Sequence, residues 1–323
     1  MAASDLRSPV RTAGLTVLFV ALGAAAAWAV SQHAAPVHPD VQGREAVLDR
    51  VAPEIEAASF GTSHARAVDY GMLGVRGFHF SLGGSDLFEA VRLFRHARRR
   101  LPALREAYVV VSPRQVVNSA FPERHGRRRS VYVQTGDYRP MSGDWRLALT
   151  SPLSPLARDD HWAAVFSGSG DKPAFGPDGA LLNERPQRSF EAIKSEGPRR
   201  AAYHGDLARR SEEAYPGLCA DLGRLLETLV EESVGLRLVL YTPPYPRAYY
   251  EAVVGPPATC DLRPVAARLA GAYAHVFYLD ASTSALSDDL VLFLNADHLN
   301  DAGAAAFSAM LRDTMATVGL REP

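Results

Sequence analysis

Two short stretches, far apart in the chain, carry side chains that can perform nucleophilic catalysis. Ser63 lies in the sequence FGTSHA, and His298 lies in the sequence NADHLNDAG. A serine hydroxyl is a weak nucleophile at neutral pH, so it needs an adjacent base, most often a histidine, which a third group orients. Ser63 and His298 can therefore act together only if the fold returns the second stretch to the first.

Each of these residues also has a purely structural interpretation. Ser63 could be a turn residue whose hydroxyl bonds to its own backbone, and His298 could be a helix-entry residue that a backbone carbonyl satisfies. His64 is the histidine nearest to Ser63 in sequence. Because adjacent side chains diverge, we expect His298 rather than His64 to serve as the base.

The apolar runs of the chain predict the scaffold that positions both stretches. Five short runs have the residue types of buried strands, and helical patterns separate them. This alternation predicts a three-layer α/β/α protein with a flavodoxin-like parallel sheet. In such sheets ligands bind at the carboxyl ends of the strands, and FGTSHA directly follows the first run. The expected strands are 55–60, 75–80, 107–112, 236–241 and 275–279.

Three helices have clear boundaries in the sequence. The first is expected from Ser85, its N-cap, to Leu101, because apolar residues recur there at helical spacing. A second begins near Pro216 and ends at Gly235, since glycine commonly terminates helices. The last helix is expected to be capped by Asn300. Its buried stripe is expected to consist of Phe307, Leu311 and Met315.

An insertion from 113 to about 200 interrupts the alternation of strands and helices. It is rich in turn-forming residues, as in SGSGDKPAFGPDGALL. Insertions of this length in a compact domain are usually functional or disordered, so this one is either a lid beside the site or a surface excursion. The segment 242–250, TPPYPRAYY, follows the fourth expected strand. We interpret it as a rigid turn lined by aromatic rings, with a sugar-binding platform as the alternative.

The N-terminal region predicts export of the main domain. Residues 13–30 form an uncharged apolar run, at the short end of what spans a bilayer. Arg7 and Arg11 precede the run, and no Lys or Arg follows it until Arg44. By the positive-inside rule, residues 1–12 form a cytoplasmic tail.

We therefore expect a single-pass anchor at 13–30 in the inner (cytoplasmic) membrane. A linker at 31–43 follows it, and a domain at 44–323 lies on the periplasmic or extracellular side. A signal peptide cleaved after Ala29 is the alternative, because the residues before that position resemble a cleavage site.

Composition and cysteine content narrow the functional classes. The 323 residues carry a net charge of −1 at pH 7, which argues against a nucleic-acid partner. Cys219 and Cys260 could form a disulfide in an exported domain, with two separate buried thiols as the alternative. Metal-ligand spacings and glycine-rich phosphate loops are absent from the sequence, so we expect no metal and no cofactor.

Three short blocks resemble the SGNH (GDSL-like) hydrolases and acyltransferases. They are GTS at 61–63, SLGGS at 81–85 and NADH at 295–298. The chain looks most similar to the membrane-anchored branch of this superfamily. That branch includes the alginate O-acetyltransferases and the DltD proteins of D-alanyl teichoic acid synthesis, which act on envelope polymers.

The resemblance implies roles for individual residues. Ser63 would attack an acyl carbonyl, and His298 would take its proton. The backbone N–H groups of Ser63 and of Gly83 or Gly84 would stabilise the oxyanion. Asn118, beyond the third expected strand, is a weaker oxyanion candidate.

The group that orients the histidine departs from the family pattern. The family has an acidic residue three positions before the histidine, and this chain has Asn295 there. An asparagine can orient an imidazole but lacks the full charge that stabilises imidazolium. Asp297 is a substitute only if the loop turns it toward His298, which is uncommon for adjacent side chains.

The resemblance implies an O-acyltransferase, most simply an O-acetyltransferase, that acts on cell-envelope polysaccharide or exopolysaccharide. Its partners would be the polymer and a membrane protein that delivers the acyl group. A polysaccharide acetylesterase is the first alternative. An inactive SGNH-like binding or scaffold protein is the second, and Asn295 is the residue that keeps it open.

Overall fold

The computed structural model describes residues 16–23, 39–81, 83–117, 120–121, 125–141, 144–151, 175–180, 187–254 and 260–320. A five-stranded sheet lies at its centre, with every neighbouring pair parallel and the strand order β2-β1-β3-β4-β5. This is the order of flavodoxin-like sheets, and it confirms the predicted α/β class with a parallel sheet. Each strand overlaps its predicted run. The strands are β1 (Ala57–Phe60), β2 (Gly77–His79), β3 (Glu106–Val110), β4 (Arg237–Thr242) and β5 (Val276–Asp280).

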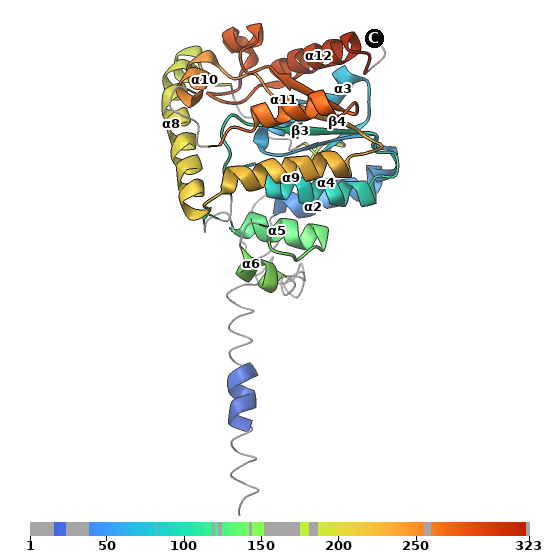
Figure 1. The fold of residues 1–323 in the computed structure, drawn as a ribbon, viewed down its shortest axis with the longest axis vertical. Coiled ribbons are helices and arrows are strands. Elements are labelled where there is room, and N and C mark those ends of the chain that lie inside the picture. The colour runs from blue at the N-terminus through green and yellow to red at the C-terminus, as the bar shows by residue number, and fades with distance from the viewer. Residues whose placement is uncertain are drawn as a thin grey trace, which may run out of the picture.

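Helices cover both faces of the sheet (Figure 1), and β1 and β3 are accordingly buried along their whole length. Side chains alternate between the faces, so Ala58 and Phe60 pack into one core and Ala57 packs into the other. The first core includes residues of α2 (Pro39–Val51), α4 (Leu87–Arg100), α9 (Leu218–Glu232) and α11 (Arg263–Ala272). The second includes residues of α3 (Tyr70–Leu73) and α12 (Asp301–Thr317).

The helix starts test the predicted caps. Asn300 caps α12 by accepting a hydrogen bond from the Gly303 N–H at 2.9 Å, as predicted. The predicted stripe of α12 is fully buried; it consists of Phe307, Leu311 and Met315. The prediction of Ser85 as the N-cap of α4 is wrong. Asp86 accepts from the Glu89 N–H at 3.0 Å and Glu89 accepts from the Asp86 N–H at 3.2 Å, a reciprocal capping box.

The predicted insertion contributes helices to the folded body. It contains α5 (His125–Thr135) and α6 (Trp145–Thr150), and its predicted end near 200 falls inside α8 (Phe190–Ala214). α8 packs along α10 (Arg247–Val254), and Figure 1 shows the two helices together at one side of the sheet. Residues 152–174 and 181–186 lie outside the described residues.

Little of the predicted membrane region is described. Of the anchor at 13–30, only residues 16–23 are described, and they are helical; the tail at 1–12 lies outside the described residues. α2 begins at Pro39, which is inside the predicted linker at 31–43. In the ranges given above, no helix combines the length and the apolar character needed to cross a membrane.

Cys219 and Cys260 form a disulfide whose Cα atoms are 5.1 Å apart. Of the two alternatives that the sequence left open, the bonded pair is the one in the structure. Cys219 lies in the first turn of α9 and Cys260 shortly precedes α11, so the bond joins α9 to the segment that leads into α11. α9 ends at Glu232, slightly before Gly235, where the sequence predicted its end.

Candidate active site

Ser63 lies just beyond the carboxyl end of β1, at the start of the 3-10 helix η2 (Ser63–Ala67). The chain leaves the strand through Gly61, whose φ of 117° favours glycine. A Cβ at Gly61 would lie 3.3 Å from the Cβ of Val110 on β3, so the turn also needs a small residue. Thr62 caps η2 with its side chain. These features present Ser63 at the edge where ligands bind to parallel sheets.

His298 lies on the loop that leads from β5 into α12. A short antiparallel bridge between Phe293 and Leu299 closes this loop, and the ring of Phe293 is fully buried. α12 packs against η2, because its apolar stripe belongs to the same core as Ala65 of η2. The last helix therefore returns His298 to the first strand.

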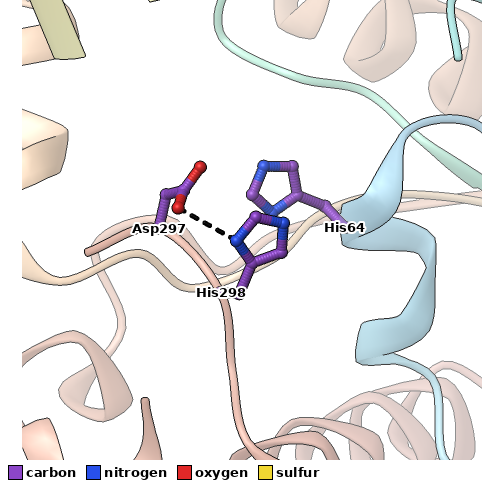
Figure 2. A group of neighbouring side chains, drawn as sticks. All are labelled: His64, Asp297 and His298. Atoms are coloured by element: carbon purple, nitrogen blue, oxygen red, sulfur yellow. Dashed lines mark hydrogen bonds and ion pairs between the residues drawn. The ribbon is translucent and has the colours of Figure 1, made fainter. Parts of the chain in front are cut away.

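Ser63, His298 and Asp297 form a continuous hydrogen-bonded series. The Ser63 Oγ lies 2.7 Å from the His298 Nε2, and the His298 Nδ1 lies 2.9 Å from the Asp297 Oδ1 (Figure 2). With Nδ1 protonated and donating to the carboxylate, Nε2 offers a lone pair that accepts the Ser63 hydroxyl. This is the arrangement of nucleophile, base and orienting acid in serine hydrolases.

Asn295 shapes the turn that brings Asp297 and His298 together. Its Oδ1 accepts the backbone N–H groups of both residues at 3.0 Å, and it lies 3.2 Å from the His298 Nδ1. An Asn side chain that bonds to the following backbone in this way forms an Asx-turn. The expectation that adjacent side chains diverge does not hold in this turn, and Asp297 supplies the closer oxygen to the imidazole.

Arg200 and His204 lie beside the Asp297 carboxylate, which is 2% exposed. Its Oδ2 accepts from the Arg200 Nε at 3.2 Å and lies 3.9 Å from the His204 Nε2. Burial alone raises the pKa of Asp297, but the hydrogen bond and charge of His298, with the charge of Arg200, hold the net pKa well below its usual range. The carboxylate therefore stays ionised and is able to stabilise an imidazolium.

The uncharged ring of His64 packs against the ring of His298. Its ring stacks on that of His298, with centroids 4.6 Å apart and planes at 13° (Figure 2), and it contacts the edge of Tyr245 at 5.2 Å. Burial, reinforced by the charge of His298, lowers the pKa of His64 to about 3. His64 is therefore uncharged at neutral pH.

The side chains of this cluster are also of types that can ligate a metal ion. His64, Asp297 and His298 offer ligand atoms that all lie within 4.8 Å of one another. The lone pairs of imidazole nitrogens lie in the ring planes, and these two planes are nearly parallel, so they do not converge on one ion. Both nitrogens of His298 are also hydrogen-bonded. The geometry therefore favours proton transfer over metal ligation.

A cavity of about 520 Å³ adjoins Ser63. The predicted oxyanion residues Gly83 and Gly84 line the same cavity as the serine. Asn118, the weaker oxyanion candidate, lies outside the described residues. The cavity thus gathers the nucleophile, the base and two of the predicted oxyanion positions from loops that follow β1, β2 and β5.

Aromatic side chains form part of the cavity wall. Tyr245 and Tyr249, from the segment after β4, are 1% and 4% exposed, and their ring centroids lie 5.3 Å apart with the planes tilted by 35°. Buried rings of this kind match the predicted rigid turn better than a sugar platform, which needs an exposed face. Tyr203 on α8 also lines the cavity, and in contrast to the two buried tyrosines it is 50% exposed.

Sequence reasoning missed the contribution of α8. Arg200, Tyr203 and His204 all line the cavity, and they come from the end of the insertion and the helix beyond it. Their spacing places them on one face of a helix, which is a signal that the sequence contains. The contacts of Arg200 and His204 with Asp297 depend on the packing of α8 against α10 and have no local signal.

Comparisons of the chain with models of known protein families, with curated proteins and with solved structures found no match.

Proposed function

We propose that the protein is a serine-dependent O-acyltransferase, most simply an O-acetyltransferase, that acts on cell-envelope polysaccharide or exopolysaccharide. The observation that carries the proposal is the Ser63–His298–Asp297 series, with separations of 2.7 and 2.9 Å. Residues 235 positions apart meet here at the ligand-binding edge of a parallel sheet. A structural serine in a turn has no need of an imidazole backed by a buried carboxylate.

The first half-reaction would load the serine. The Ser63 Oγ attacks the acyl carbonyl while the His298 Nε2 takes its proton, and Asp297 stabilises the imidazolium that forms. Backbone N–H groups of Ser63 and of Gly83 or Gly84 would stabilise the oxyanion. The leaving group then takes the proton from His298, and the acyl group remains on Ser63 as an ester.

The second half-reaction decides between transfer and hydrolysis. If a sugar hydroxyl enters, His298 removes its proton and the sugar oxygen attacks the ester carbonyl. The bond from the acyl group to the Ser63 Oγ then breaks, Ser63 takes the proton back from His298, and the acyl group passes to the polymer. If water enters, the product is a free acid and the protein is a polysaccharide acetylesterase. Ser63 is half-buried in a cavity rather than sealed, which keeps hydrolysis as the second candidate.

The likeness to SGNH enzymes agrees with the flavodoxin-like strand order and with a serine block after the first strand. We propose on this basis a membrane-anchored, exported member of that class, with a membrane partner that delivers the acyl group. The inactive binding protein was kept open by Asn295. It loses support because Asp297 supplies a carboxylate oxygen to His298.

Hydrolysis of an activated aryl acetate by the purified full-length chain tests the proposal. We expect release of acetate by the wild type and loss of release in Ser63→Ala and His298→Ala, with circular dichroism unchanged. Equal release by all three proteins would refute the nucleophile assignment. Adding a polysaccharide acceptor then separates the candidates, because a transferase acetylates the polymer and an esterase does not.

A further inference from the structure

Two partners of Asp297 belong to α8, whereas Ser63 and His298 lie on the loops that follow the strands. Arg200 donates through Nε to the Asp297 Oδ2 at 3.2 Å, and the His204 Nε2 lies 3.9 Å from the same oxygen. His298 uses the other oxygen, Oδ1. Each carboxylate oxygen therefore has its own partner from a different part of the chain.

The two ring nitrogens of His204 have different neighbours, Tyr249 at Nδ1 and Asp297 at Nε2. The Tyr249 hydroxyl lies 2.7 Å from the His204 Nδ1. Burial keeps the pKa of Tyr249 well above its usual range, so the hydroxyl retains its proton and is able to donate a hydrogen bond to Nδ1. In the tautomer of neutral His204 that accepts this bond, the N–H is on Nε2, which faces the Asp297 carboxylate.

α8 is held in place by packing that does not involve Asp297. Ile193 and Ala201 are buried on its inner face. At Gly197 the helix comes so close to α10 that a Cβ would lie 3.1 Å from the Tyr249 backbone nitrogen. The position of α8 therefore fixes where the Arg200 side chain begins, and the ion pair with Asp297 follows from that packing.

We propose that Arg200 is a positioning residue of the Ser63 site, which holds the Asp297 carboxylate so that Oδ1 faces the His298 Nδ1. α8 thereby couples the insertion to catalysis. The inference rests on the proposed serine-dependent function. Without the Arg200 contact, the carboxylate loses the hydrogen bond that fixes its rotation. Because the Arg200 side chain is 44% exposed, we expect its loss to affect orientation more than folding.

The electrostatic consequence is a change in pH dependence. Removal of the Arg200 cation favours the protonated state of neighbouring groups, so the acidic limb of the kcat/KM profile is expected to move to higher pH. The other titratable groups around Asp297 stay in place. They are His204 on α8, His298 on the same loop, His64 on η2, and Tyr245 and Tyr249 after β4.

The test compares Arg200→Met and Arg200→Lys in the full-length chain, with Arg199→Met as the matched control. Arg199 is the exposed neighbour on the same helix. With an aryl acetate as substrate, we expect Arg200→Met to lower kcat about 10- to 100-fold and to move the acidic limb upward. Arg200→Lys should return the acidic limb to its wild-type pH, because lysine keeps the positive charge. It should recover only part of kcat, because an ammonium group lacks the planar geometry of a guanidinium. Arg199→Met should match the wild type.

A proton NMR measurement supplies a readout that does not depend on turnover. The Nδ1 proton shared by His298 and Asp297 is expected to give a far-downfield resonance in the wild type, in Ser63→Ala and in Arg199→Met. The resonance should shift or broaden in Arg200→Met and recover in Arg200→Lys.

Two results would overturn the inference. One is wild-type kcat, pH profile and resonance in Arg200→Met. The other is an equal loss in the Met and Lys variants with an unmoved limb and resonance, which indicates a merely structural role. Failure of the proposed function gives a different result from failure of the inference about Arg200. If the proposed function is wrong, the wild type and Ser63→Ala release acetate equally, whereas the Nδ1 resonance still shows whether Arg200 positions Asp297.

Discussion

Two serine–histidine pairs lie on this sheet, one just beyond its carboxyl edge and one inside it. At the edge, the Ser63 Oγ lies 2.7 Å from the His298 Nε2. Inside, the Ser59 Oγ on β1 lies 2.8 Å from the His79 Nδ1 on β2. The residue types and the distances are nearly the same, so the difference in expected chemistry must come from the surroundings.

Exposure separates the two pairs. Ser59 is 0% exposed, so no substrate carbonyl can reach its hydroxyl, whereas Ser63 lines a cavity. The exposure of the neighbouring acid differs in the opposite direction, because the acid beside the inner pair is the more exposed one. Asp178 lies 3.8 Å from the His79 Nε2 with a side chain that is 41% exposed, whereas Asp297 is 2% exposed. A useful nucleophile therefore combines an accessible serine with a sheltered acid, and the inner pair has neither.

The largest expected difference is between the two serines. Ser63→Ala is expected to lower kcat for an aryl acetate by about 10⁴- to 10⁶-fold, because the attacking atom is lost. Ser59→Ala should leave kcat within about twofold and lower the free energy of unfolding by about 1 kcal/mol, the typical worth of one hydrogen bond. Acetate release and urea unfolding measure the two effects. A comparable loss of kcat in both variants would contradict the assignment of Ser63 as the nucleophile and Ser59 as a structural residue.

The two acids give the next largest contrast. Asp297→Asn is expected to lower kcat by about 10³- to 10⁴-fold, because an amide can favour the wrong tautomer and cannot stabilise imidazolium. Asp178→Asn should change the free energy of unfolding by less than about 1 kcal/mol, since exposed ion pairs contribute little, and leave kcat unchanged. Steady-state kinetics of the two variants decide the matter. Near-normal turnover in Asp297→Asn would return the orienting role to another group.

The buried inner pair should show itself in stability. Burial, opposed by the charge of Asp178, lowers the pKa of His79 from 6.5 to about 4. Between those two pH values the folded state therefore binds fewer protons than the unfolded state. The stability that comes from keeping His79 neutral is complete above pH 6.5 and is lost as the pH falls toward 4.

We expect the free energy of unfolding to fall between pH 7 and pH 4.5 by about 2 kcal/mol more in the wild type than in His79→Gln. Urea unfolding at both pH values measures it. His64, which titrates in the same direction, is present in both proteins, so its effect cancels. An identical pH dependence in the two proteins would show that His79 is not held neutral by burial.

The smallest expected effect concerns Asn295. Its Oδ1 accepts two backbone N–H groups, and an aspartate oxygen can accept the same bonds. Asn295→Asp should therefore preserve or raise turnover, within about threefold, whereas Asn295→Ala should lower it by about tenfold through loss of the turn. The kinetics of the two variants distinguish the roles. A clear loss in Asn295→Asp would count against the hydrogen-bonding series proposed for the site.

Much of the scaffold could be predicted because its signals are local. Buried strands are short apolar runs, and the stripe of α12 repeats at helical spacing. Asn300 caps α12 as its side chain chemistry suggests. The error at α4 was also local, because Ser85 and Asp86 are both good caps and only the reciprocal bonds with Glu89 select the second.

The site could be predicted only in part. The pairing of Ser63 with His298 followed from two sequence blocks and a sheet that brings loop ends together. The preference for Asp297 over Asn295 depends on the backbone turn that Asn295 itself stabilises. The role of Arg200 depends on the packing of α8 against α10, which no short stretch of sequence encodes.

Trapping of the acyl-enzyme tests directly whether Ser63 is the nucleophile. The full-length chain is mixed with an aryl acetate, quenched during the first turnover, digested and analysed by mass spectrometry. We expect one added acetyl group on the peptide that contains Ser63 in the wild type, and none in Ser63→Ala. An acetyl group on a different residue, or turnover that leaves Ser63 unmodified at every time point, would contradict it.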